Sequence, residues 1–179
     1  MTESEAPLEP EDRTPMALRL YHGALAASFI GAWALESVWR EAHAWLGYTL
    51  AGLLLWRLVY GLSGPQAWRF ATFIVGPRRV WRYAIDLGHG RAALRAGYNP
   101  LAGWAIAGHM LVLGAVVFSG HGLTTDTFWG DEALQLAHAL LVDAMWVMVA
   151  LHLGGVTLAS VRSRRLLPLA MLSGRRYPH

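Results

Sequence analysis

Two histidines, His138 and His152, lie fourteen residues apart in the apolar stretch LQLAHALLVDAMWVMVALHLGGV. On an α-helix, fourteen residues turn through about 1,400°, about 40° short of four full turns, and rise about 21 Å. The two imidazoles therefore share one helix face but lie near opposite ends of it. Two ligands of one metal ion on one helix would be three or four residues apart. The spacing therefore predicts two separate sites.

Two earlier histidines lie at matching depths. His22 is near the start of the first long apolar stretch of the chain, and His43 is at the start of the second. If consecutive helices cross a membrane in alternate directions, His22 reaches the depth of His152 and His43 reaches that of His138. Neutral imidazole is a good ligand for heme iron, and two imidazoles fill both axial positions. The pattern predicts two bis-histidine hemes that pass electrons.

Two further features of the sequence bear on these hemes. Cysteine is absent, which excludes covalent attachment of heme through thioethers and iron–sulfur ligation by thiolates. Glycines lie close to three of the four histidines, at Gly23 beside His22, at Gly47 after His43, and at Gly154 and Gly155 after His152. They either let flat rings approach the backbone or serve ordinary helix packing, and the sequence leaves both readings open.

The elements that must position these histidines are membrane helices. Four stretches, at about 16–39, 43–62, 100–119 and 132–161, are long enough to cross a bilayer, which takes about twenty apolar residues. Only 15% of the 179 residues are charged, against about 25% in soluble domains. We predict an all-α fold, a four-helix transmembrane bundle, over residues 16–179. Residues 1–15, which are acidic and rich in proline, are predicted to be a disordered tail.

The arginines predict the orientation of the helices. Every basic residue is an arginine, and most lie either in the connection at about 63–99 or after residue 161. The loop between the third and fourth stretches contains acidic residues and no arginine. By the positive-inside rule, both termini and the connection at 63–99 are cytoplasmic. Aromatic residues alternate with arginines in that connection, which predicts one or two helices in the headgroup region and needs no nucleic-acid partner.

The remaining histidines are weaker candidates. His89 and His121 are expected in solvated loops, and His179 is the last residue. His109, in the middle of the third stretch, is expected between the depths of the two hemes. An unpaired carboxylate in lipid is costly, so we expect Asp143, at a similar depth in the fourth stretch, to pair with His109.

Several segments, in order along nearly the whole chain after the tail, resemble the bacterial cytochrome b561 family, which includes the b-type cytochrome subunits of membrane-bound nickel–iron hydrogenases. The segments are RLYH at 19–22, HAWLGY at 43–48, WRLVYGLSG at 56–64, RFATFIVGPRRVWRY at 69–83, RAGYNPLAGW at 95–104, AHALLVDAMWVMVALHLGGV at 137–156 and LAMLSGRR at 169–176. The resemblance implies a multi-pass protein of the bacterial inner membrane, with a four-helix bundle that binds two noncovalent b hemes.

The resemblance also assigns roles to individual residues. The ligand histidines of the family pattern fall on His22, His43, His138 and His152. The family further suggests that Arg57 lies near a heme propionate, although an arginine at the end of a span can also be a snorkelling anchor.

The resemblance implies a function in electron transfer. It suggests a subunit that carries electrons between a periplasmic redox partner, either a hydrogenase or a c-type cytochrome, and the quinone pool. Two departures, Tyr98 in place of a frequent histidine and a short outer loop, favour a c-type cytochrome or a freestanding role over a hydrogenase. One alternative is a standalone oxidoreductase that passes electrons from a small donor such as superoxide to quinone. Another is a heme-free scaffold or proton carrier. A homodimer is compatible with each reading.

Overall fold

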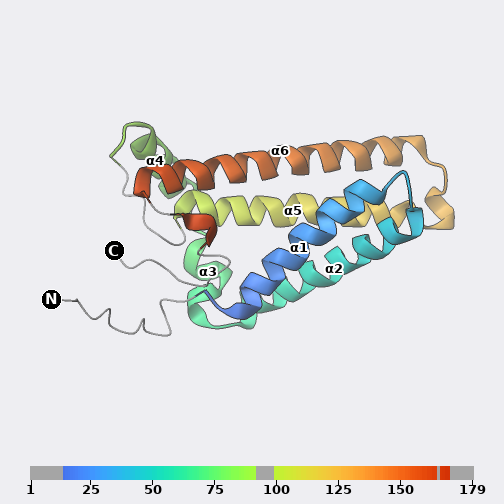
Figure 1. The fold of residues 1–179 in the computed structure, drawn as a ribbon, viewed down its shortest axis with the longest axis horizontal. Coiled ribbons are helices and arrows are strands. Elements are labelled where there is room, and N and C mark those ends of the chain that lie inside the picture. The colour runs from blue at the N-terminus through green and yellow to red at the C-terminus, as the bar shows by residue number, and fades with distance from the viewer. Residues whose placement is uncertain (1–13, 92–98, 165, 170–179) are drawn as a thin grey trace.

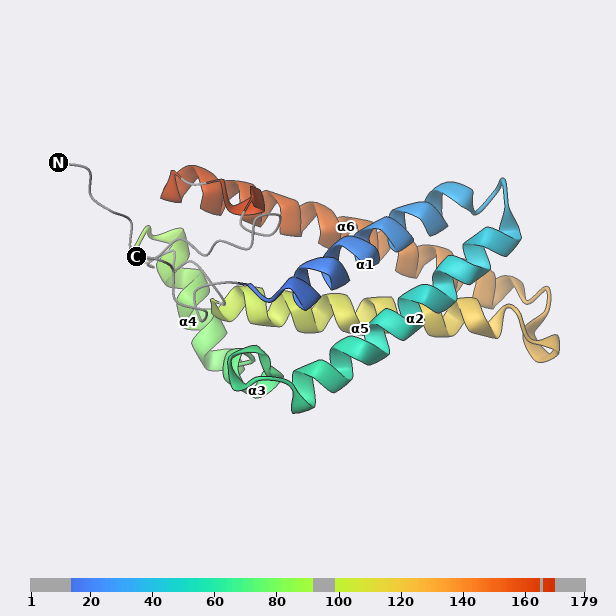
Figure 2. The ribbon, with the colours of Figure 1, turned by 60° about the horizontal axis from the view of Figure 1, so that its bottom comes forward.

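Four long helices dominate the structure, a computed structural model that describes residues 14–91, 99–164 and 166–169. They are α1 (Met16–Leu35), α2 (Arg40–Ser63), α5 (Pro100–Gly122) and α6 (Glu132–Ser163). Within the described ranges no strand is present, as the sequence predicts. Figure 1 shows the four helices running along the long axis of the molecule, and Figure 2 shows the same arrangement from a second direction.

The helix ends follow from local sequence. Helix α1 ends four residues earlier than expected, because the backbone N–H groups of Val38 and Trp39 both bond to the carbonyl of Leu35 in a turn. The side chain of Asn99 accepts a hydrogen bond from the backbone N–H of Ala102 and so caps α5. Asp131 caps α6 in the same way.

Three of the described helices, α2, α5 and α6, are long and apolar enough to cross a membrane. Helix α1, with 20 residues that include Arg19 and His22, is not among these three. The prediction of helices long and apolar enough to span a membrane is therefore confirmed for the second, third and fourth stretches. The first stretch forms a helix, and its crossing of the membrane stays a prediction.

The long helices pack in a chain, with α1 on α2, α2 on α5 and α5 on α6. Each contributes one buried side chain to a common core at mid-length: Phe29 from α1, Leu50 from α2, Leu113 from α5 and Met145 from α6. Leu113 is only 1% exposed. In lipid, close packing of this kind holds helices together, since there is no hydrophobic gain from leaving water.

The connection between α2 and α5 forms short helices at one end of the molecule. These are η2 (Gln66–Trp68), α3 (Phe70–Phe73) and α4 (Pro77–Gly88). Helix α4 packs on α5 and carries exposed arginines on one side together with Trp81, which is 71% exposed. The predicted helices in this connection are confirmed, and a tryptophan among arginines is typical of a helix in the headgroup region.

The two ends of the molecule differ in charge. At one end α1 and α5 begin, α2 and α6 end, and α3 and α4 lie (Figure 1). We call this the basic end, since among the described residues it holds every arginine except Arg40. At the opposite end a turn joins α1 to α2, and η3 (Asp126–Phe128) lies between α5 and α6.

Candidate functional site

The structure brings His22 of α1 together with His152 of α6 near the basic end. Their ring centres are 6.4 Å apart and the rings are tilted by 48°. A metal–imidazole bond is about 2 Å long and the ring centre lies about 1 Å beyond the nitrogen, so two imidazoles on opposite sides of one metal have centres about 6 Å apart. The observed separation therefore fits two axial ligands of one iron.

A second pair lies at the opposite end, where His43 of α2 faces His138 of α6. Their ring centres are 6.3 Å apart and the rings are nearly perpendicular, at 77°. The two pairs share α6, and fourteen residues separate His138 from His152 along it, which corresponds to a rise of about 21 Å. The sequence predicts this pairing of the four histidines by depth, and the structure has the same pairs in contact.

Hydrogen bonds fix the rings of the second pair. The Nδ1–H of His43 donates to the backbone carbonyl of Ala32 at 2.9 Å. Ser119 donates its hydroxyl hydrogen to the carbonyls of its own helix, so its oxygen accepts from Nδ1 of His138, also at 2.9 Å. With Nδ1 engaged in both residues, Nε2 is the nitrogen left free to bind a metal. Sequence reasoning missed Ser119, which lies nineteen positions from His138 on another helix.

Open space surrounds the glycines near the histidines. A Cβ atom added at Gly23, Gly47, Gly154 or Gly155 would meet nothing within 4 Å. Glycines that serve packing behave differently: a Cβ at Gly61 would overlap the ring of Phe70. Of the two readings left open by the sequence, helix packing is therefore wrong for these four glycines. Gly23, Gly154 and Gly155 are exposed and Gly47 is half-buried, so nothing in the described part of the chain blocks a flat group such as a porphyrin from lying against them.

Arg57 lies near the basic end in an unusual environment. It is only 3% exposed, and its guanidinium carbon lies 4.7 Å from the centre of the Phe70 ring. Its Nη1 atom is buried and has no hydrogen-bond partner. A buried arginine without an anion is costly, and a bidentate carboxylate is the partner that a guanidinium prefers. The expectation of a surface anchor at the end of the span is wrong for so buried a side chain.

His109 and Asp143 differ from the expectation. The Nδ1–H of His109 donates to the carbonyl of Ala105 at 2.7 Å, and its ring lies 5.8 Å from that of His152. Asp143 is exposed, and no hydrogen bond or ion pair joins these two described residues. The predicted His109–Asp143 pair is therefore wrong, since His109 turns towards the histidines and Asp143 away from the core.

The other histidines have separate environments. His89 is exposed at the end of α4 and donates to the carbonyl of Ile85. His121 lies in the last turn of α5 and not in a loop, and its Nδ1 is 3.2 Å from the hydroxyl of Tyr48. His179 and the larger part of the predicted tail, residues 1–13, lie outside the described residues.

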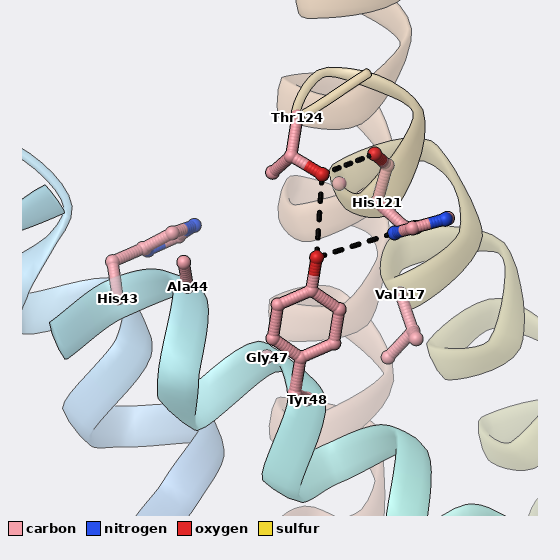
Figure 3. A pocket seen from close by; sticks show the side chains of 8 residues that line it. His43, Ala44, Gly47, Tyr48, Val117, His121 and Thr124 are labelled. Atoms are coloured by element: carbon pink, nitrogen blue, oxygen red, sulfur yellow. Dashed lines mark hydrogen bonds between the residues drawn. The ribbon is translucent and has the colours of Figure 1, made fainter. Parts of the chain in front are cut away.

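A cavity of about 60 Å³ adjoins the second histidine pair, between α2 and α5. Figure 3 shows His43 on one side of it and the Tyr48, His121 and Thr124 side chains together on the other. Gly120 also lines the cavity, and a Cβ atom there would lie 3.0 Å from the ring of His138. The cavity therefore lies beside the rings of the second pair.

Comparison with known proteins agrees with this geometry. The family model of prokaryotic cytochrome b561 matches residues 13–174, which include both histidine pairs and Arg57. No match was found among curated proteins or among solved structures. The family consists of membrane proteins that bind b-type heme and take part in electron transport. With nearly the whole chain matched and the histidines paired across its helices, this protein belongs to the prokaryotic cytochrome b561 family.

Proposed function

We propose that this protein is a diheme b-type cytochrome, with His22 and His152 as the axial ligands of one heme and His43 and His138 as those of the other. The observation that carries the proposal is the pair of ring separations, 6.4 Å and 6.3 Å, at two depths along α6. Both are close to the separation of about 6 Å that two imidazoles on one metal require.

The protein supplies the histidine ligands of the heme iron and holds their rings in a fixed orientation. When bound, heme supplies a one-electron carrier whose potential depends on its axial ligands and their hydrogen bonds. Two imidazoles leave the metal no open position, so small molecules do not become ligands there. The bonds from Nδ1 of His43 to Ala32 and of His138 to Ser119 hold both rings at the opposite end in a fixed orientation.

Arg57 supports a heme at the basic end. It lies on α2, and its Nη1 atom is buried without a partner. Tyr21, next to His22 in sequence, stacks on Trp56, which precedes Arg57. The guanidinium is therefore close to the first histidine pair. We assign to Arg57 the binding of a propionate of that heme, which would remove the cost of the unpaired charge.

We further propose that α1 is the fourth membrane span and that the basic end faces the cytoplasm of a bacterial inner membrane. The arginines of the described connection and of the end of α6 support this orientation. Electrons then pass across the membrane between a periplasmic partner, a c-type cytochrome or a hydrogenase, and the quinone pool. The two heme sites, about 21 Å apart along α6, divide this path into shorter steps.

A heme count tests the proposal. The purified protein should show two hemes per chain and the α-band of a six-coordinate b-type cytochrome in a reduced-minus-oxidised spectrum. Acid–acetone should extract all of the heme, because no cysteine can hold it covalently. One heme per chain, or a spectrum of five-coordinate heme, would contradict two bis-histidine sites.

A further inference from the structure

A group of three polar side chains closes the cavity beside the second histidine pair. They are Tyr48 from α2, His121 from the last turn of α5 and Thr124 just after it (Figure 3). The remaining lining residues, apart from His43, are small or apolar: Ala44, Gly47, Val117 and Gly120. The three polar groups come from segments more than seventy residues apart in sequence, so the packing of α2 on α5 brings them together.

The Tyr48 hydroxyl is poorly satisfied within this group. It lies 3.3 Å from Oγ1 of Thr124, longer than the usual O–H···O distance of about 2.5–3.0 Å, and 3.2 Å from Nδ1 of His121, at the long end of the usual distance of about 2.7–3.2 Å between nitrogen and oxygen. Thr124 has already donated its hydrogen to the carbonyl of His121, at 2.7 Å. Tyr48 can therefore turn its O–H to a stronger acceptor without breaking a good hydrogen bond.

The cavity limits what that acceptor can be. Its volume of about 60 Å³ has room for a few atoms of the size of a water oxygen, which suits a carboxylate, and a larger hollow of about 410 Å³ shares Tyr48, Val117 and His121 with it. His43 and Gly47 line the cavity, a Cβ at Gly47 would meet nothing within 4 Å, and Gly120, which also lines it, adjoins the ring of His138. A carboxylate that enters it would therefore extend from a group bound between these two histidines.

Charge at this end favours neutral donors for such a carboxylate. Arg40 is the only described arginine there, and it is exposed with no hydrogen bond or ion pair in the described part of the chain. At the basic end, by contrast, the buried guanidinium of Arg57 is available to bind a carboxylate. The two ends thus offer different partners to a carboxylate: a guanidinium at one and hydroxyl and imidazole groups at the other.

We infer that Tyr48, His121 and Thr124 form a carboxylate-binding subsite that receives a propionate of the heme between His43 and His138. This inference rests on the proposed diheme function. The hydroxyl of Tyr48 donates to the carboxylate, and His121 and Thr124 hold that hydroxyl at the edge of the cavity. The subsite fixes the rotation of that heme about the axis between its two ligands.

The test compares the holoprotein with Tyr48→Phe, which removes only the hydroxyl. Heme release to an excess of apomyoglobin is followed in detergent. One of the two hemes should leave about tenfold faster in the variant, because a hydrogen bond to a charged group is lost, and the other should leave at the unchanged rate. Tyr60→Phe is the matched control, since Tyr60 stacks on Trp56 towards the basic end. Arg40→Gln tests whether the one described arginine at this end binds the carboxylate instead.

A second measurement identifies the carboxylate. Heme labelled with heavy carbon in its propionate carboxyls is introduced biosynthetically, and redox-difference infrared spectra are recorded. Tyr48→Phe should shift a labelled carboxylate band, and Tyr60→Phe should not. The inference is overturned if Tyr48→Phe leaves both the release rates and the labelled bands unchanged, or if only Arg40→Gln alters them. Failure of the diheme proposal is a different result, namely fewer than two hemes in the unsubstituted protein.

Discussion

The ring of His109 lies 5.8 Å from that of His152 and at 74° to it. His152 therefore has two imidazole neighbours, His22 from α1 and His109 from α5, and the rings of all three lie near the same depth. The separation of His22 from His152, at 6.4 Å, matches that of the pair at the opposite end. His109 is held by its own helix through the carbonyl of Ala105, and we assign it to packing against the ligand ring.

This assignment predicts different results for two alanine variants. His22→Ala should lower the heme content from two per chain to one, because an axial ligand is lost. His109→Ala should keep two hemes and destabilise the protein by about 1–3 kcal/mol through the loss of a packed side chain. Heme counts and thermal unfolding of the purified variants measure both effects. If His109→Ala loses a heme and His22→Ala does not, His109 is the axial ligand and His22 is the packing residue.

A second prediction concerns the hydrogen bond between Ser119 and His138. Ser119→Ala removes the acceptor of the Nδ1–H and should weaken heme binding at that site about 10–100-fold, since partners of this kind orient a ligand ring. Heme titration or release kinetics measure the change. Ser160→Ala is the matched control, because the hydroxyl of Ser160 on α6 bonds only to the carbonyl of Val156. Equal effects of both substitutions would count against a role for Ser119 in ligation.

The depths of the four histidines could be predicted from the sequence because helix geometry is regular. A rise of about 1.5 Å per residue and alternate helix directions are enough to match His22 with His152 and His43 with His138. The direction in which a helix faces its neighbours is harder to predict. Asp143 and His109 lie at similar depths along their helices, but they point to different sides, so depth alone led to a wrong pair.

Contacts that involve the short segments between the long helices could not be predicted from the sequence either. The environment of Arg57 depends on α3, which places Phe70 against Gly61 one turn further along α2. The Tyr48 cluster depends on the turn after α5, where Thr124 bonds back to the carbonyl of His121. Neither contact has a local pattern, because each joins a long helix to a segment whose path is set by packing.

The open glycines give a third prediction. Gly47 lies one turn after His43, and side chains on a helix lean towards its N-terminus, so a large residue there would enter the space beside the imidazole. Gly47→Leu should therefore reduce heme at the opposite end to less than about half of the normal content, while the helix, with nothing in the way, stays folded. Gly52→Leu is the control: its Cβ also meets nothing, but it lies about 180° from His43 around α2. Circular dichroism and heme counts distinguish the two variants, and equal heme in both would exclude a flat group beside Gly47.

The last prediction uses the buried charge of Arg57. Without heme, its Nη1 atom has no partner, and Arg57→Leu should leave the apoprotein as stable as before or more stable, since replacing an unpaired buried charge by an apolar side chain removes a desolvation cost. With heme, the same substitution should weaken binding at the basic end by about 1.5–3 kcal/mol, the range for hydrogen bonds to charged groups. The two effects have opposite signs, which a general loss of packing cannot produce. Unfolding of heme-depleted protein and heme release from the holoprotein measure them separately, and Arg82→Leu, at an exposed position of α4, is the control. If Arg57→Leu destabilises the heme-free protein and leaves heme release unchanged, Arg57 stabilises α2 and α3 and does not bind a propionate.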